Sequence, residues 1–116
     1  MTDAEKRLHA KFAQTESGRE PVKEWLKRLS RADRLIIGAD MKTVEYGWPI
    51  GMPTCRSLGK GLWEVRSNIS DGRIARVIFY VADDDMILLH GFIKKTQKTP
   101  KGDLDIALER KRLMAD

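Results

Sequence analysis

LWEVRSNISDGRIARVIFYVADDDMILLHGFIK, residues 62–94, is the stretch that decides the fold. Apolar and polar side chains alternate within three runs, which span residues 62–68, 73–81 and 86–94. Two short polar segments, SDG and DDD, separate these runs. Alternating runs that are joined by short polar turns are typical of neighbouring antiparallel strands. The stretch therefore predicts an antiparallel three-stranded meander.

Helical patterns lie on both sides of this stretch. Pro21 suits the first turn of a helix, and the apolar residues that follow it recur at the spacing of one helix face: Val22, Trp25, Leu26 and Leu29. A second helix is predicted to begin after a Ser30 cap, with Asp33 three residues later, and to end near Gly47. A third helix is predicted after Pro100 and extends to residues 110–114.

The remaining segments complete the expected order. Residues 7–14 alternate like a half-buried strand, and residues 47–61, with four glycines and two prolines, predict a connecting loop. The order is then β-α-α-β-β-β-α, a single α+β domain over residues 1–116 with a helical hairpin on one face of a small antiparallel sheet. A chain of 116 residues is long enough for one compact domain and too short for two.

Charge narrows the range of partners. The formal net charge is +5, which favours a nucleic acid, an anionic membrane or an acidic protein. No segment reaches the ~20 apolar residues that span a bilayer, so no membrane partner is expected. The single cysteine, Cys55, rules out an internal disulfide and favours a cytoplasmic protein. Neither a metal site nor a cofactor is expected, because no cysteine or histidine pairs and no phosphate-binding glycine loop are present.

Strand alternation sorts the side chains of the meander onto two faces. Trp63, Val65, Val77, Ile87 and Leu89 are expected on the face that packs on the helices. The other face is expected to be open and to carry cations together with groups that can move protons: Glu64, Arg66, Arg76, Tyr80, His90, Phe92 and Lys94. Arginines bind phosphate through forked donors, and aromatic rings stack on bases. A simpler reading is that Glu64 only pairs with the arginines across the ladder.

Several of these segments resemble one known family. GLWEVRS, GRIARVIFYV and LLHGFIKKTQKTP, followed by DLDIALER, are similar to the HigB-like, phage-derived branch of the RelE/ParE toxin superfamily. EPVKEWLKRL in the first predicted helix also fits that branch, so the resemblance covers the chain from about residue 8 to residue 113. It implies the small α+β fold and the toxin of a type II toxin–antitoxin pair. Relatives of the RelE and HigB kind cut messenger RNA on the ribosome, whereas ParE-like relatives inhibit DNA gyrase.

The resemblance also implies a set of site residues. Arg66, Arg76, Lys94 and Lys95 stand where such nucleases bind RNA and stabilise the transition state. One of Lys94 and Lys95 could also serve as the base, and Glu64, Tyr80 and His90 are rival proton carriers. Further contacts with RNA are expected from Arg73, Phe92, Lys98 and Lys101. The expected chemistry needs no metal, because the 2′-hydroxyl of the RNA attacks the adjacent phosphorus.

The expected partners follow from the same resemblance. They are messenger RNA on the ribosome and a cognate helix-turn-helix antitoxin, which would form a hetero-oligomer with the toxin. A different class of function explains the charge equally well. The protein would then be a gyrase inhibitor or a basic binding module, and it would cut no RNA.

Overall fold

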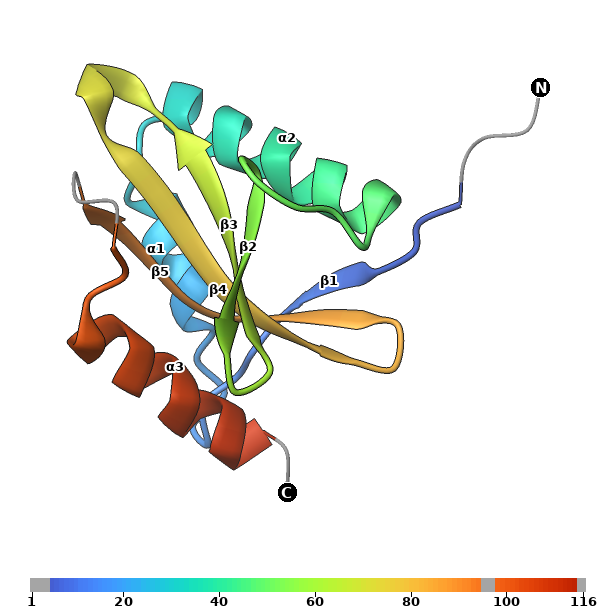
Figure 1. Cartoon of the computed structure of the whole chain (residues 1–116). Coiled ribbons are helices and arrows are strands. Elements are labelled where there is room, and N and C mark those ends of the chain that lie inside the picture. The colour runs from blue at the N-terminus through green and yellow to red at the C-terminus, as the bar shows by residue number, and fades with distance from the viewer. Residues whose placement is uncertain (1–4, 95–97, 115–116) are drawn as a thin grey trace.

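A computed structural model gives the fold for residues 5–94 and 98–114. The five strands form one sheet in the order β1-β5-β4-β3-β2 (Figure 1). The strands are β1 (His9–Phe12), β2 (Cys55–Gly59), β3 (Leu62–Asn68), β4 (Ile74–Ala82) and β5 (Asp85–Lys94). The helices are α1 (Pro21–Lys27), α2 (Arg31–Gly47) and α3 (Lys101–Met114), with a short 3-10 turn at Ser70–Gly72.

The predicted meander is confirmed. β3 pairs with β4, and β4 with β5, in antiparallel register, so that Arg66 lies opposite Arg76 and Arg76 opposite Phe92. The sheet as a whole is mixed, however, because β1 pairs with β5 in parallel. The expectation of a purely antiparallel sheet was therefore wrong. Two helices separate β1 from the meander, and this long connection lets β1 enter the sheet in either direction.

The predicted loop at 47–61 contains a strand that was missed. β2 pairs with β3 in antiparallel register, with Cys55 opposite Val65 and Arg56 opposite Glu64. The strand is only five residues long, and glycines and prolines surround it. Its partner is the next strand in the chain, so tertiary pairing overrides the local signal for a loop.

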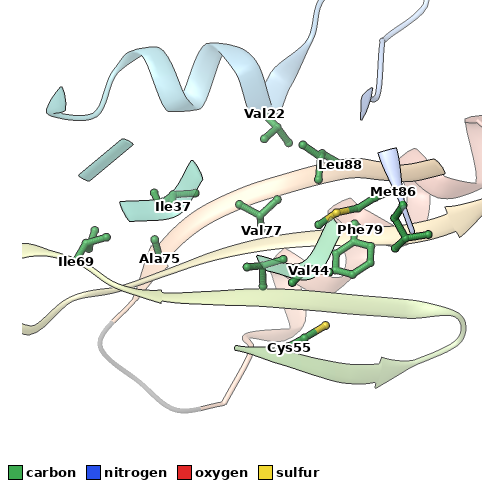
Figure 2. Close-up of a cluster of buried hydrophobic side chains, with 12 residues drawn as sticks. Val22, Ile37, Val44, Cys55, Ile69, Ala75, Val77, Phe79, Met86 and Leu88 are labelled. Atoms are coloured by element: carbon green, nitrogen blue, oxygen red, sulfur yellow. The ribbon is translucent and has the colours of Figure 1, made fainter. Parts of the chain in front are cut away.

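Both N-terminal helices pack on the same face of the sheet. Ser30 caps α2 as predicted, because its hydroxyl accepts a hydrogen bond from the Asp33 backbone N–H at 3.2 Å. Val22 of α1 joins Ile37 and Val44 of α2 in the main apolar core, which Figure 2 shows against side chains of the sheet. These helices close this face of the sheet against water.

The sequence had suggested that the second face of the meander is open, but this face is covered. α3 lies across it, on the side opposite α1 and α2 (Figure 1). Ala107 of α3 is buried with Leu62, Ile78 and Tyr80 in a second apolar core. The molecule is thus a three-layer arrangement in which helices cover both faces, and only one end of the second face extends past the beginning of α3.

An irregularity in β5 exchanges the faces of its first half. Ile78 lies opposite His90 while Phe79 lies opposite Leu88, so Leu89 has no partner on β4. Such a bulge shifts the two-residue period by one. As a result Met86 and Leu88 belong to the main core, and Ile87 and Leu89 to the core under α3, which is the reverse of the prediction.

Candidate nucleic-acid interface

Three charged side chains gather under the end of the sheet face that α3 leaves uncovered. Glu64 and Arg66 alternate onto this face of β3, and Arg76 lies opposite Arg66 on β4. Glu64 Oε1 is 3.8 Å from Arg66 Nε and 3.9 Å from Arg76 Nε. These distances are those of ion pairs rather than hydrogen bonds. Glu64 and Arg76 are completely buried, whereas the side chain of Arg66 retains 10% of its exposure.

Arg76 therefore does not lie on an open surface, and this part of the prediction was wrong. Burial lowers the pKa of its guanidinium, while the nearby Glu64 carboxylate raises the pKa and the positive charges of Arg66 and Arg56 lower it. An arginine remains protonated in proteins despite such shifts. The cluster thus holds several fixed cations around one buried carboxylate.

A hollow opens beside this cluster. Its volume is about 180 Å³. Its lining comes from the end of the meander and from the segment before β2: Met52, Pro53, Arg66, Asn68 and Ile74. Arg66 is the cation of the cluster that reaches this hollow, so a ligand there would meet Arg66 before it met Arg76 or Glu64.

The segment after β5 is fixed to the same cluster. Thr99 is buried, and its hydroxyl donates a 2.7 Å hydrogen bond to Glu64 Oε2. Lys94 ends β5 opposite Ile74, which lines the hollow, and Lys94 and Lys98 are both exposed. Lys95, which the resemblance assigned to catalysis, lies outside the described residues. Lys94 thus stands on the strand beside a residue that lines the hollow, and Lys98 directly precedes Thr99.

Phe92 separates the arginine cluster from His90. Its ring stacks on the imidazole of His90, with the centroids 5.5 Å apart, and the Arg76 guanidinium lies 5.8 Å from its centroid. Phe92 is itself buried. The predicted stacking of this ring on an RNA base is therefore wrong, because the buried ring is already in contact with His90 and Arg76.

His90 belongs to a separate polar group with two residues of α3. His90 Nε2 is 2.7 Å from Asp103 Oδ1, and His90 Nδ1 is 3.4 Å from Arg110 Nη1. This geometry fits a neutral imidazole that donates to Asp103 and accepts from Arg110. Burial lowers the pKa of His90, Asp103 raises it, and the Arg110 charge lowers it, with burial the largest effect. His90 does not line the hollow beside Arg66.

The other predicted site residues lie apart from the hollow. Tyr80 is buried under α3, where burial raises the pKa of its phenol, and it stands four residues from Arg76 along β4, or ~13 Å. Arg73 Nη2 donates to Asp33 Oδ2 at 3.0 Å and so joins β4 to the beginning of α2. Lys101 is highly exposed at the first turn of α3 and pairs with Asp105 at 3.1 Å.

Sequence reasoning missed four residues that shape these sites. Arg56 was assigned to a loop, although it stands opposite Glu64 on β2. Thr99 carries no pattern of its own that would reveal its bond to Glu64. Asp103 and Arg110 both belong to α3, and their seven-residue spacing places them on one side of that helix, a signal that the sequence does contain.

Among the residues that the structure describes, three further features were searched for: a metal site, a reactive cysteine and a membrane-spanning helix. Across residues 5–94 and 98–114, no group of three histidine, cysteine, aspartate or glutamate side chains converges as metal ligands would. Cys55 is buried, and this burial raises its pKa to about 11, which leaves its thiol protonated at neutral pH. Among the same residues, no helix combines the length and apolar character that crossing a membrane requires.

Comparison with known proteins identifies the family. A search of curated proteins gives no match. A family model described as "Phage derived protein Gp49-like (DUF891)" matches residues 24–112, which include α2, the whole meander and most of α3. The matched region contains the arginine cluster, the hollow and the Asp103–His90–Arg110 group. Because the match extends over more than half of the sequence, the chain belongs to the phage-derived Gp49-like family.

Proposed function

We propose that this protein is the toxin of a type II toxin–antitoxin pair and that it cleaves messenger RNA on the ribosome. Membership of a phage-derived family fits a mobile toxin gene. The resemblance of the meander and the lysine segment to the HigB-like branch supports cleavage of messenger RNA as the reaction. A cognate helix-turn-helix antitoxin would bind the same cationic interface and form a hetero-oligomer with the toxin.

The observation that carries this proposal is the group of arginines beside the hollow. Arg66 and Arg76 share one buried carboxylate, Glu64, and Arg56 adds a further positive charge nearby. A phosphodiester in the hollow would lie in the positive field of these arginines, and its transition state, which carries more negative charge, would be stabilised further.

We propose different roles for Arg66 and Arg76, the two arginines of the prediction. Arg66 lines the hollow and is placed to touch the phosphate. Arg76 and Glu64 are buried, so they act through Arg66 by fixing the position of its guanidinium. Thr99 holds the lysine-rich segment against Glu64, which keeps Lys94 and Lys98 beside the bound strand. A fixed arrangement of cations needs no reorganisation when charge develops on the phosphate.

Several residues are candidates for the proton transfer. Neither Tyr80 nor His90 opens onto the hollow, and Glu64 is enclosed by Thr99 and the arginines. We therefore place the removal of the 2′-hydroxyl proton on a lysine at the end of β5, Lys94 or Lys95. The leaving 5′-oxygen would take up a proton, giving a 2′,3′-cyclic phosphate and a 5′-hydroxyl.

Cleavage of messenger RNA on purified ribosomes tests this proposal. We expect Arg66→Ala to slow single-turnover cleavage by on the order of 10²–10³, the usual loss for one donor to a developing oxyanion. Arg112→Ala is the matched control, because it removes the same charge from an exposed position on α3 where Arg112 pairs with Glu109. Its rate should equal that of wild type. If Arg66→Ala also cleaves at the wild-type rate, the hollow is not the site.

One specific observation favours a second candidate function. Two of the predicted proton carriers, His90 and Tyr80, lie away from the hollow. A gyrase inhibitor or a basic binding module needs the cationic surface but no proton carrier. That function predicts growth arrest without new RNA 5′-hydroxyl ends, and it predicts that Lys94→Ala lowers affinity only. RNA ends that are labelled by polynucleotide kinase without phosphatase treatment would exclude it.

A further inference from the structure

A second hollow lies on the other side of His90, between α1 and α3. It is at the edge of β5 beyond the part that β1 covers, since β1 pairs only as far as Leu88. Its volume is about 180 Å³, and Trp25 and Gly91 contribute apolar surface. Its charged lining comes from three different segments of the chain: Arg19, Glu24, Arg28, His90 and Arg110.

Arg110 is the most informative of these side chains. Its Nη1 donates to the Leu89 carbonyl oxygen at 2.8 Å, which fixes the guanidinium at the bulge of β5. Burial alone accounts for the lowered pKa of Arg110, and no carboxylate raises it. Within the described part of the chain, Arg110 has no ion pair. A partly buried cation without a negative partner is unfavourable unless an anion binds beside it.

His90 does not supply that missing charge. Its own carboxylate partner is Asp103, which lies 2.7 Å from Nε2, on the opposite side of the imidazole from Arg110. The Nδ1 atom that faces Arg110 is neutral in the tautomer that this geometry fits. The Asp103 charge is therefore already engaged, and Arg110 remains uncompensated.

The α1 side of the hollow adds two more cations. Arg19 Nη2 pairs with Glu24 Oε1 at 2.6 Å, so the one carboxylate that lines the hollow is already neutralised. The Arg28 guanidinium makes no hydrogen bond within the described part of the chain, although its charge lowers the pKa of Glu24. Arg28, which directly follows α1, and Arg110 of α3 thus line the same hollow and both have guanidinium N–H groups available to a ligand.

From this arrangement we infer that the hollow between α1 and α3 is a second anion site, which binds a phosphate group through Arg28 and Arg110. A phosphate suits the arrangement better than a carboxylate does. Its oxygens point in tetrahedral directions and can accept from donors on different elements, whereas the two oxygens of a carboxylate lie in one plane and match the fork of one guanidinium. Trp25 provides a ring surface beside the phosphate on which a base can stack.

This site does not depend on the proposed cleavage reaction. Phe92 lies between His90 and Arg76, and none of the residues that line the second hollow lines the hollow at Arg66. Loss of phosphate binding here and loss of cleavage at Arg66 are therefore separate outcomes of separate substitutions.

Nuclear magnetic resonance titration of the full chain tests the inference. The probes are inorganic phosphate, adenosine monophosphate and a single-stranded DNA hexamer, which has no 2′-hydroxyl and cannot be cleaved by this chemistry. We expect saturable shifts of the Trp25 indole N–H and of the backbone amides of Gly91 and Arg110. Arg28→Ala should weaken binding about tenfold, the loss expected for one charge-assisted hydrogen bond. Lys27→Ala is the matched control, because it removes the same charge from the adjacent exposed residue of α1.

The outcomes distinguish phosphate binding at this hollow from nonspecific binding to surface cations. Lys27→Ala should bind as wild type does, and an equal loss in both variants would overturn the site, since any surface cation would then serve. Shifts confined to Arg66 and Lys94 would also overturn it, as would binding of an oligoglutamate peptide in preference to all three phosphate probes. If the hexamer loses more affinity than the mononucleotide on Arg28→Ala, the phosphate belongs to a nucleic-acid strand. If the mononucleotide loses as much affinity as the hexamer does, the phosphate that the site binds belongs to a free nucleotide.

Discussion

Thr99 donates a 2.7 Å hydrogen bond to Glu64, and this contact joins the segment after β5 to a carboxylate that is buried 35 residues earlier in the chain. Both residues are almost completely enclosed. The bond has two consequences. It satisfies one oxygen of a buried carboxylate, and it fastens the chain to β3 two residues before the helix that begins at Lys101.

Thr99→Val should destabilise the protein, because it keeps the shape of the side chain but leaves Glu64 Oε2 without its donor. We expect a loss of about 1–3 kcal/mol in the free energy of unfolding. Urea denaturation measures it. Thr43→Val is the control, since the Thr43 hydroxyl donates to the Ala39 carbonyl on an exposed turn of α2, and it should change stability by less than about 0.5 kcal/mol. Equal effects would show that the Glu64 contact contributes nothing specific.

Arg76→Ala should affect stability, whereas Arg66→Ala should mainly affect function. Arg76 is fully buried beside Glu64, so its loss leaves an under-compensated carboxylate and a cavity, at a cost of about 3 kcal/mol. Replacing both charges, in Arg76→Met with Glu64→Gln, should recover part of this loss. Denaturant midpoints of the wild type, of Arg76→Ala and of the double variant test both expectations. A wild-type midpoint for Arg76→Ala would contradict the buried position of this side chain.

Replacing glycine by alanine should change the stability of the protein in opposite directions at two positions. A Cβ atom at Gly91 would overlap the Trp25 indole ring, so Gly91→Ala should destabilise by about 1–3 kcal/mol. Gly38 lies within α2, with no atom near the place of its missing Cβ. Gly38→Ala should therefore stabilise by up to about 1 kcal/mol. Thermal denaturation compares the two. Destabilisation by both would indicate that α2 packs more closely than the structure shows.

The pH dependence of stability should carry a contribution from His90. Burial lowers its pKa below 6.5 in the folded protein, so the unfolded chain binds a proton more readily than the native one does. The contribution is fully present above pH 6.5 and is lost as the pH falls from there to the lowered native pKa. Urea midpoints at pH 7.5 and pH 5.5 should therefore fall less in His90→Gln than in wild type. An equal fall in both would exclude this role for His90.

The sequence by itself determined most of the secondary structure. The meander, the Ser30 cap and the helix after Pro100 are all found, because strand alternation, capping and helix periodicity are local properties of consecutive residues. The placement of Arg66 and Arg76 on one face was also determined locally, since residues on paired strands share a face when they stand opposite one another.

Only the tertiary structure decided what that face encounters. Whether Tyr80 meets water or protein depends on α3, which folds back across the sheet from the far end of the chain. The bulge at Leu89 exchanged the faces of Met86 through Leu89, because a single extra residue shifts a period of two. The bond from Thr99 to Glu64 and the approach of Arg28 to Arg110 join distant segments. No local pattern encodes such contacts, since they form only when separate elements pack together.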